Sequence, residues 1–231
     1  MNVLLDYGNF IARGAVITVA LAISSIFLAT AFGFLGCWMK LSEMRILNKI
    51  ADLYTTVVRG IPELVIMLLL YFGGQFLVNS IGEATGAWKY LELNEFAVGA
   101  LAIGTIFGAY MTETFRGAAL ALPKEEIDAA YAFGMNKRQV FRNVAWPHLV
   151  RFALPGFSNN WQSIMKSTAL VSVIGLEDIV YNGYAAGKAT HNSFSFMFLV
   201  LAFYLLLTAL SDIAIKASRT GTSRGVRKLV V

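Results

Sequence analysis

Long apolar segments divide this chain, and the first runs from Gly14 to Met39 without a charged side chain. A helix of about 20 apolar residues crosses the hydrocarbon core of a bilayer, which is about 30 Å thick. Hydrophobic residues make up 57% of the 231 positions, whereas globular proteins contain about half. The sequence therefore predicts an all-α membrane protein with five spans. The expected spans cover residues 12–39, 62–81, 96–115, 149–174 and 193–215.

These spans leave no room for a separate soluble domain, so residues 1–231 are expected to form a single transmembrane domain. The first apolar run is too long for a signal-peptide core and is interpreted as a permanent span. Cys37, the only cysteine, cannot by itself form a disulfide or a thiolate metal site. His148 and His191 are isolated and lack zinc-binding spacing. The sequence therefore predicts no metal site and does not favour an intramembrane enzyme.

The segment between the first two spans, residues 40–59, is basic and amphipathic. Its apolar residues recur at close to helical spacing, at Ile46, Ile50, Leu53 and Val57. A basic helix with one apolar face typically lies at a membrane surface. We therefore expect an interfacial helix that is broken at Gly60 and Pro62, where the second span begins.

The third and fourth spans differ in their polar content. In the third, Ala100, Gly104 and Gly108 recur every fourth residue, so one face can accept another helix at close range. The fourth contains several residues that are costly in contact with lipid: Pro155, Asn159, Asn160, Gln162 and Lys166. The fourth span is therefore expected to line a cavity or an interface.

Between the third and fourth spans lies the longest polar stretch, from Glu113 to Arg151. Pro123 suits the start of a short helix, and Gly134 suits its end, because glycine adopts the left-handed conformation without strain. Asn136 and Gln139 match a capping box that starts a second short helix, which Pro147 is expected to end. The sequence predicts a compact pair of helices joined at Gly134.

The basic residues predict how the chain is oriented in the membrane. Residues 40–63, 113–151 and 216–231 hold fifteen of the nineteen Lys and Arg residues. With five spans these segments lie on one side, and the positive-inside rule assigns that side to the cytoplasm. The N-terminus is then outside and the C-terminus is cytoplasmic. This orientation explains the basic pI without a nucleic-acid partner.

Several ordered blocks resemble the permease subunits of polar amino acid ABC importers, most closely the Q-type subunits of histidine/lysine/arginine/ornithine systems. The blocks are residues 59–62, 108–117, 128–147, 159–161 and 166–170. The block at 128–147 resembles the EAA loop of ABC-importer permeases. In that pattern an acidic residue precedes Ala-Ala, and a glycine and then a proline follow. Asp128 stands where the family usually has Glu, so its carboxylate has a shorter stem.

The resemblance implies the MetI-like fold of type I importers, in a multi-pass protein of the bacterial inner membrane. It implies a heterodimer with a homologous M-type permease, an ABC ATPase dimer that holds ATP and Mg, and an extracytoplasmic solute-binding protein. The chain itself would have no catalytic residue and no cofactor. The amino-acid substrate is expected to be histidine, lysine, arginine or ornithine, with opines or neutral polar amino acids as the alternative. A passive channel is disfavoured, because the cytoplasmic helix pair would have no function in it.

The loop at residues 123–147 is expected to couple to the ATPase. Its coupling residues are Glu126, Asp128, Ala129, Ala130, Phe133, Gly134 and Pro147. The two alanines would allow close approach of the partner, and Gly134 would form the tight turn. An ordinary amphipathic surface hairpin is the alternative interpretation.

Residues for the substrate path are expected near the fourth span. Glu177 and Asp178 suit a cationic side chain, although Glu177 is equally consistent with a solvated loop. Asn159, Asn160 and Lys166 could meet the zwitterionic backbone of an amino acid, although an ion pair or a lipid phosphate is the alternative for Lys166.

Two further charged positions are assigned from their places in the helices. Glu63 suits either the path or the N-terminal dipole of its helix. Glu113 and Arg116 suit an i,i+3 ion pair that supports the loop.

Overall fold

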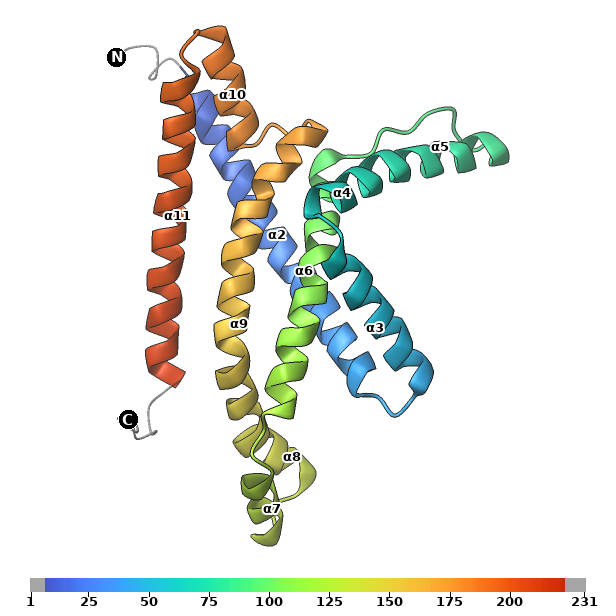
Figure 1. Ribbon diagram of the computed structural model, residues 1–231, viewed down its shortest axis with the longest axis vertical. Coiled ribbons are helices and arrows are strands. Elements are labelled where there is room, and N and C mark those ends of the chain that lie inside the picture. Colours follow the sequence, from blue (N-terminus) through green and yellow to red (C-terminus); the bar gives the residue numbers. More distant parts are fainter. Residues whose placement is uncertain (1–6, 223–231) are drawn as a thin grey trace.

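The computed structural model describes the backbone of residues 7–222 and the side chains of residues 7–216, and every regular element in this part of the chain is helical (Figure 1). The α-helices are α2 (Gly8–Leu41), α3 (Arg45–Gly60), α4 (Glu63–Leu68), α5 (Gly74–Thr85), α6 (Glu95–Leu120), α7 (Lys124–Ala132), α8 (Lys137–Val140), α9 (Trp146–Ser167), α10 (Ile179–Ala189) and α11 (Ser193–Thr222). Two π-helical turns, η1 (Leu69–Gly73) and η2 (Phe141–Ala145), and one 3₁₀ segment, η3 (Thr168–Ile174), join some of them without a break.

Within the described residues, four helical stretches are long and apolar enough to cross a membrane: Gly8–Leu41, Glu63–Thr85, Glu95–Leu120 and Ser193–Lys216. They coincide with four of the five predicted spans. The remaining predicted span, residues 149–174, falls on α9 and η3, which form a continuous rod beside α6 (Figure 1). Its polar side chains keep its mean hydropathy low, so its passage through the membrane does not follow from length and composition alone.

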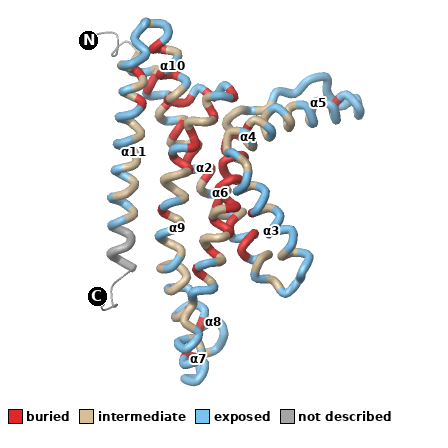
Figure 2. The backbone as a smooth tube through the Cα atoms, viewed as in Figure 1, coloured by how far each residue is buried: buried red, intermediate tan, exposed pale blue. Residues whose placement is uncertain are grey.

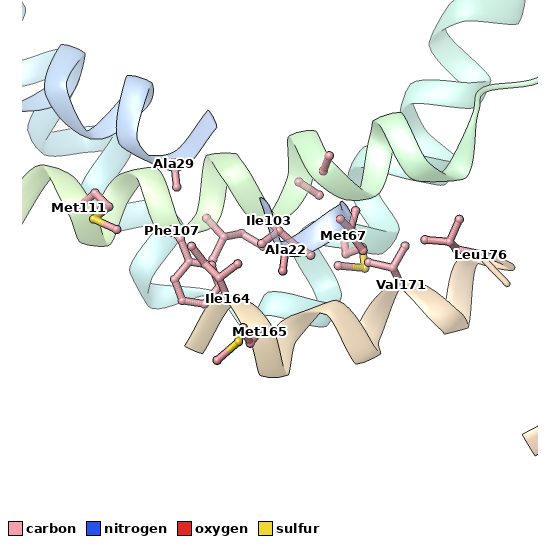
Figure 3. Packing of buried hydrophobic residues seen from close by; sticks show 14 of the residues in the cluster. Ala22, Ala29, Met67, Ile103, Phe107, Met111, Ile164, Met165, Val171 and Leu176 are labelled. Atoms are coloured by element: carbon pink, nitrogen blue, oxygen red, sulfur yellow. The ribbon is translucent and has the colours of Figure 1, made fainter. Parts of the chain in front are cut away.

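The core lies where α2, α6 and α9 cross, and Figure 3 shows its side chains meeting between these helices. Ala29, Ile103, Phe107 and Ile164 are almost completely buried there. Glycines bring α2 and α6 together: a Cβ added at Gly104 would lie 2.6 Å from the Leu28 Cβ. The predicted close-packing face of the third span is therefore confirmed.

The helix α10 lies between the fourth and fifth predicted spans, in a polar segment for which the sequence predicts no helix. It begins at Asp178, whose side chain accepts a hydrogen bond from the Tyr181 amide at 2.8 Å. Its glycines allow close contact with α11, since a Cβ at Gly183 would lie 2.6 Å from a methyl group of Val200. Small and polar residues weaken the hydrophobic pattern from which helices are predicted, and packing supplies the missing stabilisation.

The predicted amphipathic helix at residues 40–59 is present as α3, but its apolar residues face outward. Ile46, Ile50, Leu53 and Val57 are all exposed, while Ala51 and Thr55 are buried. The helix packs on α2 and α6 through its small residues, so its apolar stripe remains available to lipid or to a partner.

Figure 2 shows that burial is concentrated in α2, α6, α9 and α10, while α5, α11 and the α7–α8 pair are largely exposed. Figure 1 shows α5 projecting away from the other helices. It also shows α7 and α8 at the lower end of the molecule, the C-terminal end of α11 in the lower half, and α10 and the start of α2 at the upper end. The described parts of the basic segments 113–151 and 216–231 therefore lie in the lower half of the view, as does the turn between α2 and α3 at the start of segment 40–63.

Candidate coupling and translocation sites

The turn after α7 is built around Gly134, which has φ +82°. The Gly134 amide donates to the Tyr131 carbonyl at 2.9 Å, and the Met135 amide donates to the Ala130 carbonyl at 3.1 Å. This pair of bonds is the Schellman arrangement that ends a helix at a left-handed residue. The chain reverses sharply here because glycine has no Cβ to oppose that conformation.

The second helix of the pair starts at a capping box, as predicted. The Gln139 amide donates to the Asn136 side chain at 3.0 Å, and the Asn136 amide donates to the Gln139 side chain at 2.9 Å. The reciprocal bonds satisfy amides that have no partner inside the helix. Both ends of the turn are thereby fixed by short-range hydrogen bonds.

The prediction that Pro147 ends this second helix was wrong. The helix α8 continues through η2 into α9, and Pro147 lies in the first turn of α9. A π turn carries one extra residue and shifts the hydrogen-bond register, which lets a helix accommodate a residue that cannot donate. The coupling loop is therefore joined to α9 by continuous helix and to α6 by a short link, residues 121–123.

Glu126 holds the two arms of the loop together. Its carboxylate Oε2 lies 2.8 Å from the His148 Nε2, which joins α7 to the first turn of α9. His148 also contacts the Phe152 ring, with 5.8 Å between the ring centroids. Glu126, assigned to ATPase coupling from the sequence, thus makes a contact within its own chain.

The tip of the loop presents one aromatic residue almost completely to the outside. Phe133 is 87% exposed, and Asp128 and Ala129 are exposed on the same short helix or at its end. Ala130, by contrast, is buried, so it packs inside the loop and does not offer room to a partner. Because this aromatic residue lies outside the apolar spans, and aromatic side chains are enriched at protein interfaces, it is a candidate contact for a partner protein.

A network of charged side chains joins the C-terminal end of α2, the middle of α3 and the C-terminal half of α6. The Lys40 Nζ lies 2.5 Å from Glu113 and 2.7 Å from Asp52. The Arg116 guanidinium lies 3.1 Å from the other oxygen of Glu113, in the i,i+3 geometry expected from the sequence. Sequence reasoning missed Lys40, because 73 positions separate it from Glu113 and no local pattern connects them.

The polar residues of α9 do not converge on one cavity. Asn160 donates to the Thr114 hydroxyl at 3.1 Å and so joins α9 to α6. Asn159 and Lys166 are exposed on α9. Asn160 therefore has a packing role in this chain, while Asn159 and Lys166 are available to a ligand, lipid or partner.

Glu63, at the start of α4, contacts the end of α9. The Ser167 hydroxyl donates to its carboxylate at 2.6 Å, which joins the start of α4 to the end of α9. Glu177 is exposed in the connection before α10. Glu63 and Glu177 thus lie on different elements, the first in α4 and the second in the connection between η3 and α10.

Asp178 is completely buried, with 0% exposure, and caps α10. Its second carboxylate oxygen has no hydrogen-bond partner among the described residues. Burial raises the pKa of Asp178 to about 6, although backbone hydrogen bonds from Tyr181 and Val180 lower it. A structural cap accounts for this residue without contact with a substrate.

We expect Asp178 to make the stability of the chain depend on pH. The folded chain holds its proton more tightly than the unfolded chain, so stability is greatest below about pH 4, falls as the pH rises to about 6, and then levels off. The pKa difference of about two units corresponds to about 3 kcal/mol. In Asp178→Asn, which retains a capping side chain, the melting temperature should lose this slope.

The matched control is Glu177→Gln, which removes the neighbouring exposed carboxylate. It should melt with the same pH dependence as the wild type between pH 4 and pH 7. An unchanged slope in Asp178→Asn would show that the buried carboxyl does not titrate in this range.

Among the described residues, no three His, Cys, Asp or Glu side chains are grouped so that they could hold a metal ion. The most distinctive construction in the described residues is the two-helix element α7–α8, which is joined to α6 and α9 and carries the exposed side chain of Phe133.

Comparison with known proteins relates this construction to a family. The pattern of the family described as "Binding-protein-dependent transport system inner membrane component" matches residues 32–224. The histidine/lysine/arginine/ornithine transport system permease protein HisQ of Escherichia coli (strain K12) is 46% identical to this chain, over 90% of this chain and 91% of its own length. The octopine transport system permease protein OccQ of Rhizobium radiobacter is 37% identical, over 96% of this chain and 94% of its own length.

The fold is shared with a solved chain described as "Crystal structure of an amino acid ABC transporter with histidines". The two chains superpose with a TM-score of 0.79 at 24% identity, over 94% of this chain and 96% of the other. The importer-permease fold expected from the sequence blocks is thereby confirmed.

Proposed function

Since this chain belongs to the family of binding-protein-dependent transport system inner membrane components, we propose that it forms, with a second permease, the path of an ATP-driven importer of basic amino acids. The observation that carries this proposal is the match to permease proteins over nearly the whole chain, together with the exposed helix pair α7–α8. ATP hydrolysis takes place in a separate ATPase dimer that holds ATP and Mg. This chain moves in response and does no chemistry.

The proposed topology has five spans, with α9 and η3 as the fourth. In this arrangement the polar residues of α9 face α6 or a partner, as Asn160 does through its bond to Thr114. The end of the molecule that holds α7, α8 and Lys216 is cytoplasmic, and the end that holds α10 is outside, in a bacterial inner membrane.

Coupling runs through the α7–α8 element. A compact element that is continuous with α9 transmits a push better than a flexible loop, because η2 leaves no joint between α8 and α9. Phe133 at its tip would insert into a groove of the ATPase. The exposed helices α5 and α11 leave surfaces for lipid and for an M-type permease.

The substrate class is proposed from similarity. HisQ belongs by name to a histidine/lysine/arginine/ornithine system and is the more similar of the two relatives described above. OccQ belongs by name to an octopine system, and an opine is therefore the second candidate. A solute-binding protein would deliver the substrate from outside.

We expect the Phe133→Ala variant to insert normally but to bind the ATPase more weakly, so that the amount of ATPase that copurifies with it falls by at least about tenfold. The reason is that an aromatic residue buried at an interface often contributes about 2 kcal/mol or more to binding. The test coexpresses this chain with its paired permease and ATPase and measures the ATPase that copurifies with a tag on this chain. Phe194→Ala is the matched control, since Phe194 is 82% exposed. It is the second residue of α11, which starts beside α10 at the end of the molecule away from α7 and α8 (Figure 1).

The transport assay uses the wild-type complex in liposomes with its solute-binding protein. ATP-dependent uptake of L-arginine supports the assignment, whereas preference for L-glutamine or octopine would overturn the basic-amino-acid class. A wild-type chain that inserts but never copurifies with an ATPase would contradict the importer itself.

A further inference from the structure

A polar pocket of about 420 Å³ lies between the end of α2, the second half of α3, and α6. Side chains of Lys40, Thr56, Arg59, Tyr110 and Glu113 line it. The volume is within the range of small-molecule sites, which is about 300–1,000 Å³. Gly60 also lines the pocket, which therefore lies at the end of α3, where the chain turns towards α4 (Figure 1).

Most charges around the pocket are already paired. Glu113 is held by Lys40 and by Arg116, and Lys40 also holds Asp52. The side chain of Lys40 is only 8% exposed, so these pairs are fixed parts of the wall. A ligand that enters the pocket would therefore meet one carboxylate, that of Glu113, whose charge is already balanced.

Arg59 is the exception. Its guanidinium lies 5.2 Å from the centre of the Tyr110 ring, and no described carboxylate lies within ion-pair distance of it. The residue is exposed at the end of α3. Stacking on an aromatic face orients a guanidinium but leaves its N–H donors unused.

We propose that Arg59 binds the α-carboxylate of the amino acid as it moves through the permease. Two parallel N–H donors match the two oxygens of a carboxylate, and such bidentate pairs are among the strongest hydrogen bonds in proteins. The unpaired guanidinium leaves the pocket with one positive charge in excess, which favours an anionic group. This assignment rests on the proposed function and adds a specific contact to it.

The geometry also limits what the pocket can distinguish. Arg59 contacts the group that all α-amino acids share, and Glu113 is already engaged by two cations. The pocket therefore recognises the α-carboxylate of the amino acid and does not distinguish its side chain. Affinity for a basic and for a neutral amino acid should depend on Arg59 to the same degree.

The test measures binding to the purified permease–ATPase complex without solute-binding protein, in phosphatidylcholine nanodiscs. The probes are L-arginine, L-glutamine and agmatine, which is L-arginine without its carboxylate. In Arg59→Gln the Kd of L-arginine and of L-glutamine should each rise by at least about tenfold, as expected for a lost charge-assisted bond. The Kd of agmatine should not change.

Two variants control the experiment. Lys49→Gln removes the same charge from α3 at an exposed position outside the pocket, and it should leave every Kd unchanged. Arg59→Lys retains the charge but not the two parallel N–H donors, so its Kd for L-arginine should lie between those of the wild type and Arg59→Gln.

Other outcomes overturn the inference without touching the importer assignment. Wild-type complex that imports L-arginine but binds it equally well after Arg59→Gln would exclude the carboxylate contact. If Arg59→Gln instead removes only a thermal stabilisation by added phosphatidylglycerol, the pocket holds a lipid phosphate. Failure of the wild type to import any probe would count against the proposed function.

Discussion

Gly134→Val is expected to insert in the membrane in normal amount but to lose at least about four fifths of ATP-dependent uptake and of ATPase stimulation. Gly134 has φ +82°, a conformation that a β-branched residue adopts only under strain. Such strain costs about 1–3 kcal/mol, which lowers the population of the turn by roughly 5- to 150-fold. An added Cβ would meet no atom within 4 Å, so the strain is confined to the backbone.

Two substitutions separate backbone strain from other effects of valine. Gly134→Asn should retain most uptake, because asparagine tolerates the left-handed region better than other residues. Gly117→Val places the same side chain in α6 close to the loop, also with nothing within 4 Å, but in ordinary helical conformation. Wild-type uptake and ATPase stimulation in Gly134→Val would show that the turn does not transmit force.

The parts of the fold that were predicted correctly depend on local patterns. The apolar runs and the Asn136–Gln139 box each lie within one helix or one turn, where spacing determines geometry. The path of the chain at Pro147 could not be predicted, because a π turn changes the hydrogen-bond register without a reliable sequence signal. The helix α10 was missed for a related reason, since its glycines are stabilised by contact with α11.

The candidate sites were harder to predict because their contacts connect distant parts of the chain. The bond from Ser167 to Glu63 spans 104 positions, and the sequence gives no sign that these two residues meet. The burial of Asp178 depends on how α10 packs against α2 and α11. Residue type indicated which side chains are unusual for a membrane span, but only the arrangement of the helices shows which of them already have a hydrogen-bond or ion-pair partner.

Gly33→Ala is expected to cause a large loss of folded protein. The new Cβ would lie 2.4 Å from the Met111 Cβ and 3.2 Å from the Met111 backbone carbon. Neither atom belongs to the flexible end of a side chain, so α2 and α6 must move apart. Overpacking of this kind costs about 1–3 kcal/mol, sometimes more, out of a typical total of about 5–15 kcal/mol.

The sign of the effect separates helix packing from helix propensity. In an open helical position alanine is more stabilising than glycine by about 0.5–1 kcal/mol, so Gly117→Ala on α6 should raise the melting temperature of the purified complex slightly. Gly33→Ala and Gly104→Ala should lower it, because each places a methyl group against the facing helix. A melting temperature in Gly33→Ala equal to that of Gly117→Ala would mean that α2 and α6 are not packed this closely, and the ion network of Lys40 and Glu113, which depends on the same approach, would then be in doubt.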